Sequence, residues 1–195
     1  MPNMNYLQIF SHIITCLVEG EFMQMEDVYR IDQGIERYMT KTQKKTADFM
    51  EGCMELGGLL GDWQESEIIE LKKYGHALGM AFQITDDIMD YRETTKTTGK
   101  PVGNDLREGL LTYPLLSIVN DGNKDKLLED IKGLNNGGNE QDIIDYVVAQ
   151  GGIDNTLAVA DKYCKDALAA LAAVRDFPGK EFLVMAVENL ADRKV

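Results

Sequence analysis

Apolar side chains recur every three or four positions along the first half of the chain, the spacing of one face of an α-helix. The first stripe comprises Leu7, Phe10, Ile13, Ile14 and Leu17. Further stripes run through residues 33–60 and 65–91, and no proline, the residue that breaks helices, occurs between Pro2 and Pro101. The pattern therefore predicts three consecutive long helices.

Residues 92–104 interrupt this pattern with a polar segment that contains Gly99, Pro101 and Gly103. Such long polar loops in compact domains often carry function. Thr112, followed by Tyr113 and then a proline, predicts the start of another helix, because proline fits the first helical turn.

Helical periodicity continues in the last third of the chain, at residues 141–150, 154–174 and 180–193. Asp154 is the expected N-cap of the middle one. Alternating strand patterns do not occur. The sequence therefore predicts one all-α domain.

Composition narrows the range of partners. The chain has 195 residues, of which 44% are hydrophobic, and a formal net charge of −13. This acidity argues against nucleic acid or an anionic membrane surface as a partner held by charge. The sequence lacks an apolar run of ~18–20 residues and a secretory signal, so we expect a cytoplasmic protein without a transmembrane segment.

Three cysteines without a CxxC pair indicate neither a disulfide scaffold nor a zinc module. Cys53 and Cys164 are expected to be small core residues. His12 and Cys16 lie four positions apart, on one helical face, but no further ligand accompanies them in the sequence. We interpret this pair as ordinary core or surface residues.

Three aspartates, Asp86, Asp87 and Asp90, share one sector of the third predicted helix. In so acidic a chain the simplest interpretation is a solvated face, since clustered carboxylates repel one another. However, the preceding residues 78–84 are almost wholly apolar, and the following loop carries several cations and glycines. A divalent cation such as Mg²⁺ that bridges to a diphosphate accounts for this arrangement. An EF-hand calcium loop does not, because Tyr91 stands where that loop requires glycine.

These residues resemble motifs of the trans-isoprenyl diphosphate synthases, or polyprenyl synthetases. The second aspartate-rich motif of this family is matched by Asp86-Asp87-Ile-Met-Asp90, with Ala81-Phe-Gln83 before it and Gly99-Lys100-Pro-Val-Gly103-Asn-Asp105 after it. The family's Lys-Thr motif is matched by Lys45-Thr46, and the helix that precedes that motif by Glu19-Gly-Glu21 with Gln24. A helix start further along the family's chain is matched by Thr112-Tyr-Pro114. The resemblance implies an all-α helical bundle of the isoprenoid synthase type.

The resemblance also implies a reaction. In the family an allylic diphosphate ionises to a carbocation, which isopentenyl diphosphate then attacks to give a polyprenyl diphosphate. By resemblance, Asp86, Asp87 and Asp90 hold Mg²⁺ against the allylic diphosphate. Lys100 contacts the same diphosphate, and Asp105 supports that lysine or a metal-bound water.

The resemblance assigns roles to three further residues. Lys45 is expected to pair with the diphosphate. The Thr46 hydroxyl and the Gln83 amide are expected to direct oxygen dipoles at the developing allylic cation.

One departure from the family limits these expectations. The family has an earlier aspartate-rich motif, with neighbouring basic residues that hold isopentenyl diphosphate, and this sequence does not supply it. The acidic clusters at residues 19–21 and 26–27 lack the DDxxD pattern. We therefore expect residues 1–195 to correspond to the C-terminal part of a polyprenyl synthetase domain, lacking the N-terminal helices, with an apolar face exposed where those helices would pack.

Two functions remain open. One is a Mg²⁺-dependent prenyltransferase, incomplete as this chain alone. The other is a non-catalytic or partner-dependent subunit of a heteromeric synthase. Either a homo-oligomer or a partner chain that supplies the first motif fits these readings. A terpene cyclase does not, because residues 104–108 lack the Asn/Asp, Ser/Thr and Glu triad of its second metal motif.

Overall fold

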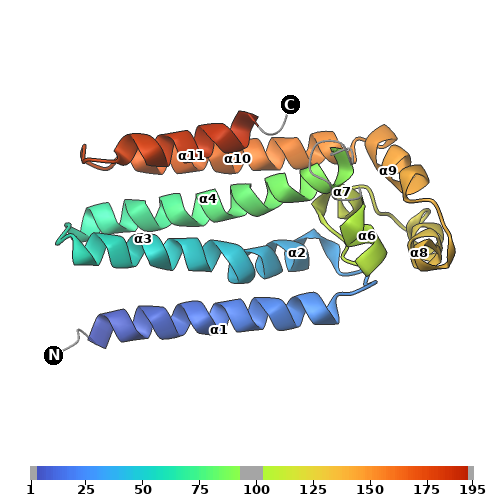
Figure 1. Cartoon of the computed structure of the whole chain (residues 1–195), viewed down its shortest axis with the longest axis horizontal. Helices are drawn as coiled ribbons and strands as arrows, with labels where there is room; N and C mark the ends of the chain where they lie inside the picture. The colour runs from blue at the N-terminus through green and yellow to red at the C-terminus, as the bar shows by residue number, and fades with distance from the viewer. Residues whose placement is uncertain (1–3, 93–102, 193–195) are drawn as a thin grey trace.

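A computed structural model describes residues 4–92 and 103–192, in which every regular element is a helix (Figure 1). The elements are α1 (Met4–Glu26), α2 (Gly34–Thr42), the π-helical turn η1 (Gln43–Ala47), α3 (Asp48–Leu60), α4 (Glu65–Arg92), α6 (Asn104–Glu108), α7 (Tyr113–Leu116), α8 (Lys124–Gly133), the 3₁₀ turn η2 (Leu134–Asn136), α9 (Glu140–Ala149), α10 (Gly152–Ala172) and α11 (Lys180–Asp192). The predicted all-α class is confirmed.

Four rows of helix lie side by side: α1, then α2 with α3, then α4, then α10 with α11 (Figure 1). The short helices α6 to α9 gather at one end of these rows. Helix α4 packs against α3 on one side and α10 on the other. Because it is enclosed on both sides, α4 buries polar Thr85 and Asp87 among its apolar residues.

The predicted helix over residues 33–60 is observed as α2, η1 and α3 in direct succession. The π turn η1 contains Lys45 and Thr46, and single π turns inside α-helices are frequent at functional sites. Two glycines let the neighbouring helices approach η1. A Cβ on Gly20 of α1 would lie 2.6 Å from the Lys45 backbone nitrogen, and one on Gly79 of α4 would lie 2.6 Å from the Ala47 Cα.

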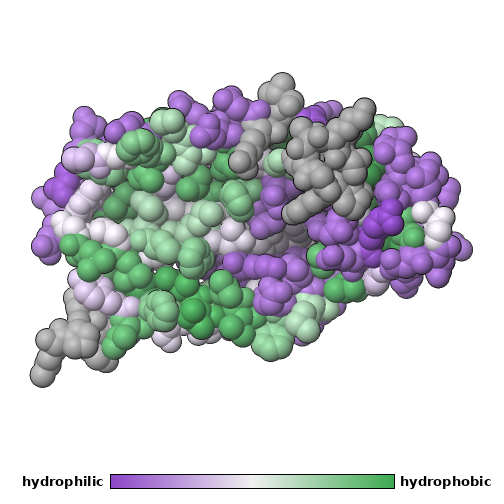
Figure 2. Space-filling view, in the orientation of Figure 1, coloured by the Kyte–Doolittle hydropathy of each residue, from purple (hydrophilic) through white to green (hydrophobic). Residues whose placement is uncertain are grey.

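Most of the apolar stripe of α1 faces outward. Leu7, Phe10, Ile14 and Leu17 are 54%, 58%, 46% and 37% exposed, and only Ile13 is buried. The buried side of α1 includes Ile13, Cys16 and Gly20, with Ile13 against Gly52 of α3 and Gly20 against Lys45 of η1. An exposed apolar face is therefore present on α1, and hydrophobic side chains gather along the edge of the molecule that α1 forms (Figure 2).

Several local predictions were wrong. Helix α10 begins at Gly152 after a left-handed Gly151 (φ 80°), so Asp154 lies inside the helix rather than at its N-cap. Helix α8 was not predicted, because its charged sequence has few apolar positions. Cys53 is exposed rather than in the core, whereas Cys164 is buried as expected.

The helix start at Thr112 is confirmed, with proline in the first turn of α7. Among the described residues, none of the helices combines the length and apolar character that a membrane span requires.

Candidate active site

Lys45 and Thr46 lie in η1, between α1 and α4. The Lys45 Nζ is 2.8 Å from a Glu21 carboxylate oxygen and donates a hydrogen bond of 2.9 Å to Gln24 Oε1. Both partners belong to α1, in the segment that resembles the helix preceding the Lys-Thr motif. The acidic and amide side chains of α1 therefore hold the Lys45 ammonium in place.

A chain of side-chain hydrogen bonds connects η1 to the aspartates of α4. The Thr46 hydroxyl donates to Gln83 Oε1 (3.2 Å), and Gln83 Nε2 donates to Asp87 Oδ1 (3.3 Å). The Tyr38 hydroxyl donates to the other oxygen, Asp87 Oδ2, at 2.5 Å. Half-buried Gln83 thus has partners at both ends of its amide, so a polar amide is stable in an otherwise apolar stretch.

The three aspartates of α4 leave the same helical sector but reach different surroundings. Asp86 is exposed, whereas Asp87 is 3% exposed and turns inward to Tyr38. The Asp90 carboxylate accepts hydrogen bonds from the backbone amides of Asn104 (3.1 Å) and Asp105 (3.2 Å) at the start of α6. This contact brings residues from both sides of the predicted loop together.

A cavity of about 180 Å³ lies where these elements meet. Its walls include six of the residues predicted from the sequence: Lys45, Thr46, Gln83, Asp86, Asp87 and Asp105. Asp90 adjoins it through its contact with the Asp105 amide. Lys100 lies outside the described residues.

Tyr38 and Lys41 also line the cavity and were missed by the sequence analysis. Lys41 is 8% exposed, and its Nζ lies 3.8 Å from buried Asp27 Oδ2 and donates to Gln33 Oε1 at 3.4 Å. Burial lowers the pKa of Lys41. Positions 38, 41 and 45 are spaced by three and four, so the helical period itself could have indicated that these residues share one face.

The charged forms of the carboxylates at this site are destabilised, mainly by burial. Burial raises the pKa of Asp87 from its ordinary value to about 7, against the opposing effect of the Tyr38 and Gln83 hydrogen bonds. Burial, then the neighbouring Asp90 and Asp86 carboxylates, raise the pKa of Asp105 to about 6. Burial also raises the pKa of Asp90. Buried carboxylate oxygens that face one another are the type of group that a hard divalent cation such as Mg²⁺ prefers.

The sequence model of one protein family, described as polyprenyl synthetase, matches residues 1–150. The chain belongs to this family. The resemblance carried by the second aspartate-rich motif and the Lys-Thr motif is thereby confirmed.

Curated relatives of this polyprenyl synthetase chain include prenyl diphosphate synthases. It is 31% identical to heptaprenyl diphosphate synthase component 2 of Geobacillus stearothermophilus, over 83% of this chain and 50% of that protein. It is 32% identical to octaprenyl diphosphate synthase of Escherichia coli, over 94% of this chain and 58% of that protein. The chain thus spans little more than half the length of these relatives.

Solved structures agree with this assignment. Heptaprenyl diphosphate synthase from Staphylococcus aureus superposes with a TM-score of 0.87 at 28% identity, covering 100% of this chain and 62% of that one. A polyprenyl synthase from Caulobacter crescentus, complexed with calcium and isoprenyl diphosphate, superposes with a TM-score of 0.86 at 28% identity, covering 99% and 60%. The described helices therefore have the isoprenoid synthase fold.

Proposed function

We propose that this chain provides the part of a polyprenyl diphosphate synthase that binds and ionises an allylic diphosphate, for condensation with isopentenyl diphosphate. The observation that carries the proposal is the single cavity lined by Lys45, Thr46, Gln83 and three aspartates, namely Asp86, Asp87 and Asp105. Cations, amide and hydroxyl dipoles and carboxylates in one cavity are what ionisation of a diphosphate ester requires, because charge develops on both the leaving group and the carbon.

In this proposal Mg²⁺ is bound by Asp86 and Asp90, with Asp105 beside them, and when bound it neutralises the charge of the departing diphosphate. Asp87 is already hydrogen-bonded by Tyr38 and Gln83, so we assign it to orienting Gln83 as well as to the metal site. The calcium and isoprenyl diphosphate in the Caulobacter crescentus structure, in a protein of the same fold, support a paired cation and diphosphate here.

The remaining roles follow from the observed contacts. Lys45 exchanges its partners Glu21 and Gln24 for a diphosphate oxygen when substrate binds, and we assign Lys100 to the same diphosphate. Because the Thr46 hydroxyl donates to Gln83 Oε1, its lone pairs remain available to stabilise a developing carbocation.

We further propose that catalysis needs a partner surface, either a second chain or helices that carry the first aspartate-rich motif. Three observations support this. The chain spans 50–58% of the prenyl diphosphate synthases named above. One of those relatives is called a component of its synthase. The face of α1 that carries Phe10 and Phe22, which are 58% and 60% exposed, is apolar and uncovered within the described residues. The alternative is a non-catalytic subunit that binds diphosphate without turning it over.

Binding of a non-hydrolysable allylic diphosphate analogue tests the site. Calorimetry with and without Mg²⁺ is expected to show Mg²⁺-dependent binding, weakened about tenfold or more by Asp86→Ala, because a metal ligand is removed. Asp125→Ala, which removes an exposed carboxylate from α8, is the matched control. Equal affinity in both variants would overturn the metal assignment.

Partner dependence is tested separately. The purified chain alone is expected to condense allylic and isopentenyl diphosphates little or not at all. Robust turnover would refute the proposal that catalysis needs a partner surface. It is also expected to self-associate through α1. Phe10→Glu is then expected to reduce association in light scattering, whereas Phe182→Glu, at a 67% exposed position of α11, is expected to leave it unchanged.

A further inference from the structure

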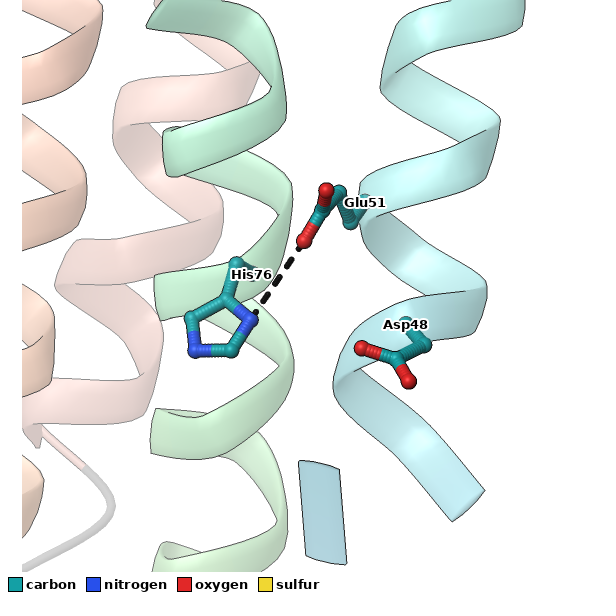
Figure 3. Close-up of side chains that lie close together, drawn as sticks. All are labelled: Asp48, Glu51 and His76. Carbon is teal, nitrogen blue, oxygen red and sulfur yellow. Dashed lines mark ion pairs between the residues drawn. The ribbon is translucent and has the colours of Figure 1, made fainter. Parts of the chain in front are cut away.

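We propose that Asp48, Glu51 and His76 form a second metal site, selective for a divalent transition-metal ion such as Zn²⁺ over Mg²⁺. The three side chains come from two facing helices. Asp48 and Glu51 extend from successive turns of α3 toward α4, and His76 reaches back from α4 (Figure 3).

The ligand atoms of these residues are already close. One from each residue lies within 4.8 Å of the other two, and the His76 Nδ1 is 3.5 Å from Glu51 Oε2. In the parts of the chain that the structure describes, no other group of three acidic, histidine or cysteine side chains is so close. Bonds of about 2.0–2.2 Å to one ion place tetrahedral ligands about 3.4 Å apart, so a shift of roughly 1 Å in side-chain position assembles the site.

The surroundings suit a bound ion. All three residues are half-buried and sit on long helices, which limits how far the ligands can move apart. A cavity of about 250 Å³, lined by Asp48, Glu51 and His12, adjoins them. It leaves space for water or a small anion to complete the coordination shell.

The ligand types set the metal class. An imidazole nitrogen with two carboxylate oxygens is typical of Zn²⁺ and similar transition metals, whereas Mg²⁺ prefers oxygen ligands alone. The site is separate from the aspartate-rich motif, because His76 and Asp86 are ten residues apart on α4, a rise of about 15 Å.

Two existing contacts compete with the metal. Gln43 Nε2 donates a hydrogen bond of 3.2 Å to Asp48 Oδ1, and Lys72 contacts Glu51. The Lys72 Nζ lies 3.6 Å from a Glu51 oxygen and 2.8 Å from a Glu55 oxygen. Glu55 keeps the shorter contact when Glu51 turns to a metal, so Lys72 retains a partner. Glu55 also supplies a control, because it is a carboxylate on the same helix that contacts the same lysine but lies outside the metal group.

The test is a titration of the full chain with Zn²⁺ and, separately, with Mg²⁺, followed by NMR of the imidazole protons. The chain has only two histidines, so His76→Gln assigns the signals. Zn²⁺ is expected to shift the His76 signals and Mg²⁺ to leave them in place. Absence of a Zn²⁺-induced shift in the wild-type chain would overturn the proposal without reliance on any variant.

Calorimetry with Zn²⁺ supplies the second readout. Glu51→Gln is expected to weaken Zn²⁺ binding about tenfold or more, and Glu55→Gln to change it less than about twofold, although both remove one charge beside Lys72. Circular dichroism verifies that both variants fold. Equal losses of Zn²⁺ affinity in the two variants would mean that binding depends only on local charge, which would overturn the proposed site.

Discussion

Removal of one hydroxyl, in Tyr38→Phe, tests whether buried Asp87 depends on its hydrogen bond to Tyr38. The Tyr38 ring is 2% exposed and Asp87 is 3% exposed, so water cannot readily replace the lost donor. The hydrogen bond is 2.5 Å long, and the remaining donor to Asp87, Gln83 Nε2, is 3.3 Å away.

The expected magnitude depends on the charge of Asp87. A hydrogen bond to an ionised group contributes about 1.5–3 kcal/mol, and one between neutral groups about 1 kcal/mol. With the pKa of Asp87 near 7, the carboxyl group is mostly protonated at pH 5 and mostly ionised at pH 8. Tyr38→Phe is therefore expected to lower the free energy of unfolding by about 1 kcal/mol at pH 5 and about 2 kcal/mol at pH 8.

The same shift predicts the pH dependence of the unsubstituted chain. Because the pKa of Asp87 is raised from 3.8 to about 7, the folded state holds a proton that the unfolded state has released between these values. The Asp87 contribution to stability is therefore greatest below about pH 4 and falls as the pH rises toward 7. Loss of the Tyr38 hydrogen bond raises the Asp87 pKa further, so in Tyr38→Phe the fall continues to higher pH.

Urea unfolding followed by circular dichroism, with a chelator present to keep metal from the aspartates, measures both effects. Tyr113→Phe is the control, because it removes a hydroxyl from the ring packed edge-on against Tyr38, at a centroid distance of 5.6 Å, and leaves the Tyr38–Asp87 hydrogen bond in place. A loss in Tyr38→Phe that is the same at pH 5 and pH 8, or equal to that of the control, would refute this reasoning.

Three further substitutions test how the helices around the site are held together. Gly79→Ala is expected to destabilise the chain by about 1–3 kcal/mol in urea unfolding, because the new Cβ would lie 2.6 Å from Ala47 Cα. Gly57 has open space around it, so Gly57→Ala is expected to stabilise the chain by about 0.5–1 kcal/mol. Similar effects of the two substitutions would contradict close helix packing at Gly79. Arg37→Ala is expected to lower the urea midpoint, because it removes the 2.6 Å partner of the buried Asp27 carboxylate. An unchanged midpoint would mean that Arg30 and Lys41, which also face Asp27, replace it.

The long helices could be read from the sequence because their signal is local. The spacing of apolar positions in residues 33–60 and 65–91 predicted the helices observed over 34–60 and 65–92, where the π turn η1 is the unpredicted feature. A π turn adds one residue to a helical turn without a distinctive sequence, so periodicity does not detect it. Helix α8 was not predicted, because charged residues occupy most of its positions.

Which face of a helix is buried is not a local property. The stripe of α1 that includes Leu7 and Phe10 has the spacing of a core face, yet it is exposed, because the contacts to η1 run through Gly20 on another side. A single sequence reports that a helix is amphipathic but not which partner covers it.

In the candidate site, too, some features could be predicted from the sequence and others depend on tertiary structure. The residue types and spacing of Lys45, Thr46, Gln83 and the aspartates, with their resemblance to a family, were sufficient to select them from the sequence. The inward turn of Asp87, the contacts of Tyr38 and the approach of His76 to Asp48 and Glu51 depend on helices that are distant in the chain. The sequence by itself determined the long helices, the family and most of the side chains selected for the candidate site, because these depend on residue type and local period. Only the tertiary structure decided which of those side chains meet, which are buried and which face is left uncovered, since helix packing fixes all three.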